Sequence, residues 1–473
     1  MKTPLACLPS LVRRSICVGG CLLYLPSATA TPADDGAPTK SGGGVQASIK
    51  SNILLICIDD LNTQLACYGH KHVHSPNIDK LATQGRQFSR HYVQAPTCGA
   101  SRFSLLIGNY PPLNGNNGLV AKHYAKENPS PSLPHWFKSK GYQTISIGKI
   151  SHHPGGYMGK EWNDPEKPEM PGSWTRSLMP CGIWKTPRGA MHGYAEGKPR
   201  TRAYSPRIET TNKITAYPDD LILMSAVNQL NNLNKQDKPW LLAVGFIKPH
   251  LPFTAPQKFL DHYKDVKFPP IPSPDKPEGP SLWHGSGEFM RNYADKNNPN
   301  KDLKYALNVR KHYAASTSYV DDNVGKLLKH LEKSGSAKNT IIVLWGDHGF
   351  SLGEKQIWGK HHLYHTALHS PLIIKTPDQK TAGKATTAVT ETIDIYPTLC
   401  TLAGIPLPDH LDGKSLAHIV NDPSQKSDGI ANSFWAGKKS IITKDTHTIF
   451  KKGKVFLKFD LTKDPQEIYN LVN

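Results

Sequence analysis

The sequence predicts an α/β protein built on a large, mostly parallel β-sheet with helices on both faces. Apolar runs of strand length, among them residues 52–58 and 340–345, alternate along the chain with amphipathic patterns of helical length. Such alternation is typical of parallel sheets covered on both sides. The chain has 473 residues, and single cores stop growing at roughly 250–300 residues. We therefore also expect a smaller appended subdomain.

The first strand and helix of this sheet are predicted near the start of the folded chain. The almost continuous apolar run at 52–58 indicates a strand that is buried on both faces. Ser75 and Pro76 suit the N-cap and the first position of a following helix. The apolar face of that helix would consist of Ile78, Leu81, Ala82 and Phe88.

Later segments repeat the alternation of strand and helix. We expect helices around 133–139 and 221–233 and from about 303 to 333, and strands at 142–147, 240–246 and 340–345. Residues 153–215 and 264–300 lack regular periodicity. Loops this long are usually functional or disordered, and the tryptophans in them favour order. We expect both stretches to form walls of a substrate site, with Trp162, Trp174, Trp184 and Trp283 as candidates.

The start of the chain has the features of an export signal: basic residues, an apolar run and a small-residue pattern before Thr31. The Arg13-Arg14 pair leaves a twin-arginine route open beside the general one, and the residues before Cys21 faintly resemble a lipoprotein cleavage site. We expect a signal peptide at 1–30, a disordered linker at 31–48, and a periplasmic or extracellular protein.

Two further units are expected after the linker, a main domain at 49–413 and a smaller terminal α+β subdomain at 414–473. The subdomain contains strand-like segments at 440–443, 448–450 and 455–459. No run of 18 or more apolar residues occurs in the chain, so we expect no integral membrane association.

The chain is strongly basic, with a formal charge of +19, and removing the expected leader, which has three basic residues and no acidic one, lowers it to +16. A field of this sign attracts anions. Nucleic acid, acidic membrane surface and anionic polysaccharide are candidate partners, and simple solubility is the alternative explanation. Because export argues against nucleic acid, we expect none to bind.

Five cysteines lie outside the leader, and they contain no CxxC pair: Cys57, Cys67, Cys98, Cys181 and Cys400. This is not the pattern of a disulfide framework, and an odd number leaves at least one thiol unpaired or used otherwise.

Polar residues follow four of the predicted strands, where ligands of parallel sheets bind: Asp59-Asp60, Gly148-Lys149, Lys248-Pro249-His250 and Asp347-His348. The adjacent carboxylates of Asp59 and Asp60 repel each other unless a cation lies between them. Oxygen ligands suit Ca²⁺ or Mg²⁺, and Asp347 with His348 offers a second half of such a site.

The stretch Cys98-Gly99-Ala100-Ser101-Arg102 is the most informative motif. A cysteine before a helix is ordinarily a small core residue or a thiol of low pKa. Here the spacing, continued through Leu105–Pro111, resembles the signature of type I sulfatases, in which the cysteine of C-x-P/A-x-R is oxidised to formylglycine. Further segments resemble sulfatase landmarks in the family's order: 52–60, 75–79, 141–149, 248–250, 346–349, 352–354 and 460–471.

Within that family the sequence is most similar to iduronate-2-sulfatases, through Lys248–Phe253 and through His348 after Asp347. The resemblance implies an alkaline-phosphatase-like fold, with 49–413 as the sulfatase catalytic domain. It also implies hydrolysis of sulfate monoesters on a sulfated, uronate-containing or algal polysaccharide or its oligosaccharides. Exo and endo action both remain open.

The resemblance also implies roles for individual residues. Asp59, Asp60, Asp347, His348 and the modified Cys98 would bind Ca²⁺, with Mg²⁺ as the alternative. Arg102 would hold the formylglycine, and Lys149 and Lys360 would bind the sulfate oxygens. His250 would donate a proton to the leaving alcohol, and His152 would be the base toward the formylglycine hydrate, with the adjacent His153 as the alternative.

Ala100 stands where many sulfatases have Pro, a form compatible with a bacterial radical-type maturation enzyme acting before export. Two other functions remain open. A phosphomonoesterase or phosphodiesterase of the alkaline phosphatase superfamily would share the metal ligands but ordinarily uses Ser or Thr as nucleophile. A non-catalytic binder of acidic polysaccharide would explain the charge and the tryptophans. Each residue assignment also has its own alternative: Lys149 and Lys360 as solvated surface charges, and His250 as a structural hydrogen bonder.

Overall fold

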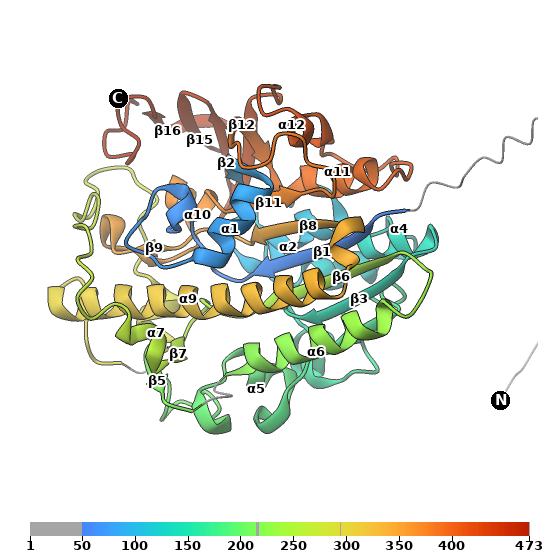
Figure 1. Cartoon of the computed structure of the whole chain (residues 1–473). Coiled ribbons are helices and arrows are strands. Elements are labelled where there is room, and N and C mark those ends of the chain that lie inside the picture. Colours follow the sequence, from blue (N-terminus) through green and yellow to red (C-terminus); the bar gives the residue numbers. More distant parts are fainter. Residues whose placement is uncertain (1–49, 214–216, 294, 473) are drawn as a thin grey trace, which may run out of the picture. The chain divides into compact units, whose positions relative to one another are not determined.

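A computed structural model describes residues 50–213, 217–293 and 295–472. The expected signal peptide and linker lie outside these described residues. An eight-stranded sheet with the order β12-β2-β11-β8-β1-β6-β3-β4 forms the centre of the described chain (Figure 1). All neighbouring strands are parallel except β11, which is antiparallel to both of its neighbours. The mixed, mostly parallel α/β sheet is therefore confirmed.

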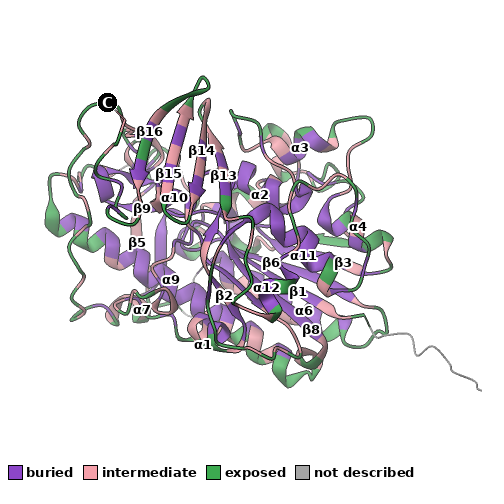
Figure 2. Cartoon of the chain, turned by 90° about the horizontal axis from the view of Figure 1, so that it is seen from above, coloured by how far each residue is buried: buried purple, intermediate pink, exposed green. Residues whose placement is uncertain are grey.

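Four strands at the middle of this sheet carry the site. They are β8 (Thr340–Gly346), β1 (Asn52–Ile58), β6 (Trp240–Phe246) and β3 (Gln143–Gly148). Each pairs in parallel with the next. Every residue of β6 and β8 is buried, and Figure 2 shows the central strands in purple beneath partly exposed helices. Their uninterrupted apolar sequences reflect this burial on both faces.

Helices cover both faces of the sheet. One face packs against α1 (Pro76–Gln84), α6 (Pro218–Leu233) and the long α9 (Leu303–Lys333), as Figure 1 shows for α6 and α9. The other face packs against α2 (Cys98–Ile107), α3 (Leu119–Tyr124), α4 (Leu133–Ser139), α11 (Ile395–Leu402) and α12 (Ala417–Asn421). Alternate residues of β1, such as Leu54 and Leu55, point into these two separate cores.

The expected helix after Ser75 is shorter than its apolar spacing predicts. It ends at Gln84, and Phe88 belongs to strand β2 (Arg86–Tyr92), so placing Phe88 on the helix was wrong. A Cβ atom at Gly85 would lie 2.7 Å from the backbone oxygen of Ile374. The chain therefore turns against a neighbouring strand at Gly85, and pairing within the sheet outweighs the helical spacing.

The edge strands of the sheet are β12 (Thr386–Glu391) and β4 (Arg176–Leu178), and β11 (Leu372–Lys375) lies between β2 and β8. A separate antiparallel sheet near the C-terminus consists of β13 (Ile430–Trp435), β14 (Lys438–Thr443), β15 (Thr446–Lys451) and β16 (Lys454–Asp460). It joins the main sheet through Glu391, whose carboxylate accepts a hydrogen bond of 2.7 Å from the backbone of Asn432.

The two stretches without periodicity contain short elements. These include α5 (Pro187–Met191), β5 (Ile208–Thr211), which pairs with β7 (Phe253–Pro256), and α8 (Gly287–Arg291). Other short elements are α7 (Gln257–Asp261), α10 (His365–Leu368), β9 (Ser351–Leu352) and β10 (Trp358–Gly359). Within the described ranges, no helix combines the length and apolar character needed to cross a bilayer.

Candidate active site

The carboxyl ends of the four central strands meet at one edge of the sheet. Asp59 and Asp60 follow β1, and Asp347 with His348 follows the adjacent β8. Backbone hydrogen bonds continue past the strand ends, from Asp59 to Phe246 at 3.2 Å and from Asp347 to Ile58 at 3.2 Å. These bonds fix the spacing of the acidic residues without the help of a ligand.

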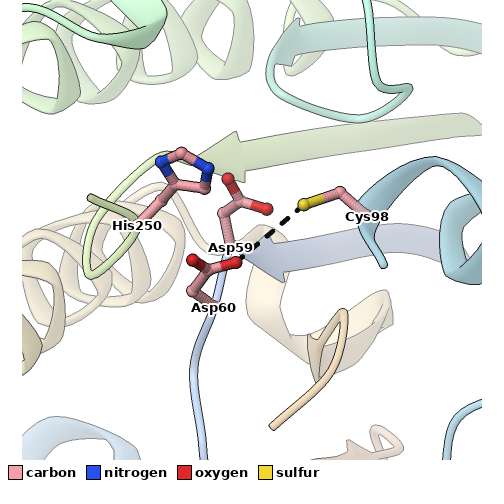
Figure 3. A group of neighbouring side chains, drawn as sticks. All are labelled: Asp59, Asp60, Cys98 and His250. Carbon is pink, nitrogen blue, oxygen red and sulfur yellow. Dashed lines mark hydrogen bonds between the residues drawn. The ribbon is translucent and has the colours of Figure 1, made fainter. Parts of the chain in front are cut away.

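Cys98 enters this group from the first residue of α2. Figure 3 shows its sulfur directed toward Asp60, at 3.9 Å from Oδ1. The sulfur also lies 3.3 Å from Nε2 of His348. Burial and the charge of Asp59 raise the pKa of the thiol well above its usual value, against the opposing effect of Lys149 and Lys360.

The start of α2 is held in place by Asn117. Its amide oxygen accepts hydrogen bonds from the backbone of Gly99 at 2.9 Å and from the hydroxyl of Thr97 at 3.0 Å. A Cβ atom at position 99 would lie 2.1 Å from the Cα of Asn117. Glycine after Cys98 is therefore required by this close approach.

Arg102, one turn into α2, bridges two carboxylates. Its guanidinium group lies 3.1 Å from Asp59 and 3.1 Å from Asp347, and all three side chains are fully buried. Lys149 also pairs with Asp59. Burial alone would raise the pKa of Asp59, but Lys149, His250 and Arg102 hold it well below its usual value. The hydrogen bonds of Arg102 go to these acids and to backbone oxygens, so its contact with a modified residue 98 stays a prediction.

The acidic residues have the chemistry of a cation site. Two overlapping groups, Asp59–Asp60–Cys98–His250 and Cys98–Asp347–His348, each have ligand atoms within 4.8 Å of one another. The Oδ2 atom of Asp60 is buried and has no hydrogen-bond partner within the described ranges. Burial and the charge of Asp59 raise the pKa of Asp347 to about 6. Carboxylates in this position are stabilised by a divalent cation, so the predicted ligand residues fit one.

Lys360 reaches Cys98 from much later in the chain, in the segment directly after β10. Its ammonium group donates a hydrogen bond to Asp60 Oδ1 at 2.6 Å and lies 3.4 Å from the sulfur of Cys98. The side chain is 2% exposed. A buried lysine beside the candidate nucleophile is not a surface charge, although its position in a Lys/His-rich segment allowed that interpretation.

His250 is held by a tight turn after β6. Its Nδ1 lies 2.6 Å from the backbone oxygen of Leu251, a contact that requires a proton on Nδ1. The turn is braced by Lys248, which the sequence places in the same motif as His250, and by Asp219, which the sequence did not single out. Lys248 donates to the backbone oxygen of Pro252 at 2.8 Å, and Asp219 accepts from the backbone of Ile247 at 2.6 Å.

The structure separates the two adjacent histidines after β3. His152 lines the same cavity as Cys98, and its buried Nδ1 has no hydrogen-bond partner in the described part of the chain. His153 points elsewhere, and its Nδ1 lies 3.1 Å from Glu169. Of this pair, His152 therefore lines the cavity that contains the candidate nucleophile, and His153 does not.

These residues open into a cavity of about 510 Å³. Cys98, Lys149, His152, His250 and Lys360 all line it. Of the four tryptophans expected in its walls, only Trp162 is present, whereas Trp174 and Trp283 line other hollows and Trp184 is buried.

Glu288 is a cavity residue that the sequence analysis missed. Its carboxylate lies 3.5 Å from Nε2 of His250 and 3.6 Å from Nζ of Lys360. Glu288 belongs to α8 in the stretch 264–300. No strand end or motif marks that stretch, so nothing in the sequence pointed to this residue.

Two family models match the chain, and several named proteins are similar to it in sequence. The family model described as Sulfatase matches residues 51–405, and one described as N-sulphoglucosamine sulphohydrolase, C-terminal, matches 353–473. A sulfatase of Formosa agariphila is 30% identical over 454 residues, covering 90% of this chain and 83% of its own. Human iduronate 2-sulfatase is 30% identical over 394 residues, covering 76% and 70%.

Solved structures share the fold at lower identity. One was solved in complex with its substrate D-glucosamine-2-N,6-O-disulfate; it has a TM-score of 0.67 at 23% identity and covers 89% of this chain and 93% of its own. The phosphonate monoester hydrolase of Agrobacterium radiobacter has a TM-score of 0.69 at 22% identity, covering 89% and 91%. At this identity the likeness concerns the fold alone.

Proposed function

Because this chain belongs to the sulfatase family and is a sulfuric ester hydrolase, we propose that it removes sulfate from sulfated glycans through a formylglycine made from Cys98. The observation that carries the proposal is the position of the Cys98 sulfur. It lies 3.3 Å from His348, 3.4 Å from Lys360 and 3.9 Å from Asp60, at the wall of the cavity. A reacting group at residue 98 would therefore face cation ligands and an ammonium group together.

The chemistry of a sulfate monoester suits this arrangement. A hydrated formylglycine would supply one hydroxyl as the nucleophile and a second from which sulfate is later expelled. The ammonium groups of Lys149 and Lys360, both buried, would neutralise the sulfate oxygens as charge develops. Because both lysines already pair with carboxylates, they are held in place before the substrate arrives.

A divalent cation is part of the proposal. Asp59, Asp60, Asp347, His348 and residue 98 would hold it, and when bound it supplies polarisation of a sulfate oxygen. Carboxylate oxygens and an oxygen in place of the Cys98 sulfur favour Ca²⁺, with Mg²⁺ as the alternative. The imidazole of His348 is the softest of these ligands.

One histidine would donate a proton in the reaction, and a second histidine would accept one. His250 carries its Nδ1 proton toward Leu251, so its Nε2 is the atom that can hold a proton for the departing alcohol. His152 would accept a proton from the formylglycine hydrate, a role supported by its buried Nδ1, which has no partner among the described residues. Arg102 would hold residue 98 indirectly, through Asp59 and Asp347.

We infer that the substrate is an oligosaccharide derived from a sulfated polysaccharide and that the specificity is iduronate-2-sulfatase-like. Human iduronate 2-sulfatase, at 30% identity, supports this choice, and the formal charge of +19 suits an anionic substrate. We also propose that a maturation enzyme converts Cys98 before export, and that the mature protein is periplasmic or extracellular. Ala100 in the motif suits a radical-type enzyme of that kind.

The test is to measure sulfate and phosphate release by ion chromatography from matched esters of one alcohol and from defined sulfated oligosaccharides. We expect sulfate from the oligosaccharides, little phosphate, and no release by Cys98→Ala. Phosphate release at a similar rate would favour a phosphoryl-transfer enzyme instead. Tight binding of the oligosaccharides without release of either ion would favour a non-catalytic binder.

A further inference from the structure

Three arginines line the active-site cavity without a role in the chemistry proposed above. Arg188 belongs to α5, Arg200 follows the short helical turn Ala195–Gly197, and Arg291 ends α8. They therefore come from the two stretches, 153–215 and 264–300, that carry no regular pattern. All three line the same cavity although they lie far apart in sequence.

These arginines differ from the other cations of the cavity in their pairing. Lys149 and Lys360 each lie against a buried carboxylate. In the part of the chain that the structure describes, no carboxylate forms an ion pair with Arg188, Arg200 or Arg291. Guanidinium groups that line one cavity without counter-charge repel one another, and an anion bound in that cavity relieves the repulsion.

Aromatic and glycine neighbours orient the three side chains. The guanidinium carbon of Arg188 lies 5.8 Å from the ring centre of Trp162, and that of Arg200 lies 5.1 Å from the ring of Tyr293. A Cβ atom at Gly287 would lie 2.5 Å from a terminal nitrogen of Arg291, so glycine leaves room for this group in the wall. The arginines are thus supported by packing, and among the described residues no carboxylate neutralises their charge.

His192 shows which side of the site they occupy. Its ring lies 5.7 Å from the ring of His250, the candidate acid toward the leaving group. Burial lowers the pKa of His192 well below its usual value, and the charges of Arg200, Lys149, Lys248 and Arg188 lower it further. Its Nδ1 is buried, and none of the described residues forms a hydrogen bond with it. Arg188 lies on α5, which ends directly before His192, and both residues line the cavity together with Arg200 and His250. This wall therefore lies on the leaving-group side, where the sugar would be.

We propose that Arg188, Arg200 and Arg291 form a second anion subsite, which binds a further negative group of the saccharide that carries the scissile sulfate. The proposal rests on the proposed function and narrows its substrate to saccharides with two anionic groups. The shared chemistry is a planar or tetrahedral oxyanion that accepts paired hydrogen bonds from guanidinium. A uronate carboxylate and a second sulfate both provide it.

The test compares two matched substrate pairs. The first is a sulfated uronate disaccharide and the same compound with its carboxyl group reduced to an alcohol. The second is a disulfated glucosamine and its monosulfated counterpart. The variants are Arg188→Gln, Arg200→Gln and Arg291→Gln, with Arg202→Gln as the control, because Arg202 is exposed in the same segment and does not line the cavity.

The readout is the ratio of kcat/KM for the doubly charged member to that for the singly charged member. We expect each cavity variant to lower this ratio by about 10-fold to 100-fold for one pair, the scale of a charge-assisted hydrogen bond, and Arg202→Gln to leave it unchanged. The pair that responds identifies the second group as carboxylate or sulfate. Equal losses for both members of each pair would overturn the subsite.

Binding separates failure of the subsite from failure of the proposed function. The same arginine variants are made in a Cys98→Ala background, and the dissociation constants of all four saccharides are measured by calorimetry. If the unaltered protein releases no sulfate but the ratio of dissociation constants still shifts with the cavity arginines, the proposed function fails and the subsite stands. If the Cys98→Ala parent has no preference for the doubly charged members, or binds none of the four, the subsite is overturned.

Discussion

The ammonium group of Lys360 lies between Asp60 and Cys98, 2.6 Å from the carboxylate oxygen and 3.4 Å from the sulfur. Replacing Lys360 with Gln removes the charge but keeps a side chain of similar length. We expect kcat/KM for sulfate release to fall by about 10²-fold to 10³-fold, the usual effect of losing one donor that stabilises developing charge. The exposed Lys380→Gln is the matched control. A loss confined to the melting temperature would argue that Lys360 has a structural role only.

The two histidines after β3 give opposite predictions. His152 borders the cavity, so His152→Ala should lower kcat by about 10²-fold to 10⁴-fold, the range for general acid–base groups. His153→Ala loses the contact with Glu169 instead. It should lower the unfolding free energy by about 1–3 kcal/mol and leave kcat within a few-fold. Steady-state kinetics and thermal melting of both variants decide between them, and a larger fall in kcat for His153→Ala would reverse the assignment.

Removal of divalent cations should affect stability as well as activity. Because Asp59, Asp60 and Asp347 repel one another in a buried site, a cation that binds only the folded protein raises its melting temperature in proportion to the logarithm of its concentration. We expect chelation to abolish sulfate release and Ca²⁺ to restore it. The Ca²⁺-dependent rise in melting temperature should be lost in Asp347→Asn and kept in the exposed control Asp378→Asn. An equal rise in both variants would contradict the assigned site.

Because of Glu391, which lies at the junction with the C-terminal sheet, we expect the stability of the fold to depend on pH. Burial and the charge of Asp394 raise the pKa of Glu391 from 4.5 to about 8. The folded protein therefore favours the neutral acid, and the stability that this contributes is complete below about pH 4.5 and is lost as the pH rises toward 8. Glu391→Gln should flatten the fall in unfolding free energy across this window, which for one group is at most about 1.4 kcal/mol per pH unit.

Thermal or urea melts at several pH values measure this effect. Glu278→Gln provides the control. The side chain of Glu278 is exposed, so its ionisation carries no cost of burial in the folded protein. Identical pH profiles for Glu391→Gln and the unaltered protein would contradict the prediction.

The parts of the fold that the sequence predicts are those with a strong local pattern. The runs at β1, β6 and β8 are apolar throughout because both faces of each strand are buried. The acidic or basic residues that follow these strands could therefore be assigned to one edge of a sheet before the strand order was known. Phe88 was misplaced because its spacing fits a helix, whereas pairing of β2 with β11 and β12 decides its conformation.

The site residues that the sequence did not predict lie far from any motif in the chain, and only the fold brings them to the cavity. Glu288 and the three cavity arginines lie in segments whose path is set by packing of short elements against the main domain. The choice between His152 and His153 was open in sequence because adjacent residues share every pattern. The contact of His153 with Glu169, 16 residues later, decides which ring points into the cavity.

The measurement that most directly tests the central claim is mass spectrometry of the peptide that contains residue 98, combined with sulfate release from the same sample. The protein is produced with and without a radical-type maturation enzyme. We expect the fraction of residue 98 converted from thiol to formylglycine to rise with the enzyme, and sulfate release to rise in proportion to that fraction. A sample in which Cys98 remains entirely a thiol and sulfate is released at the same rate would contradict the account.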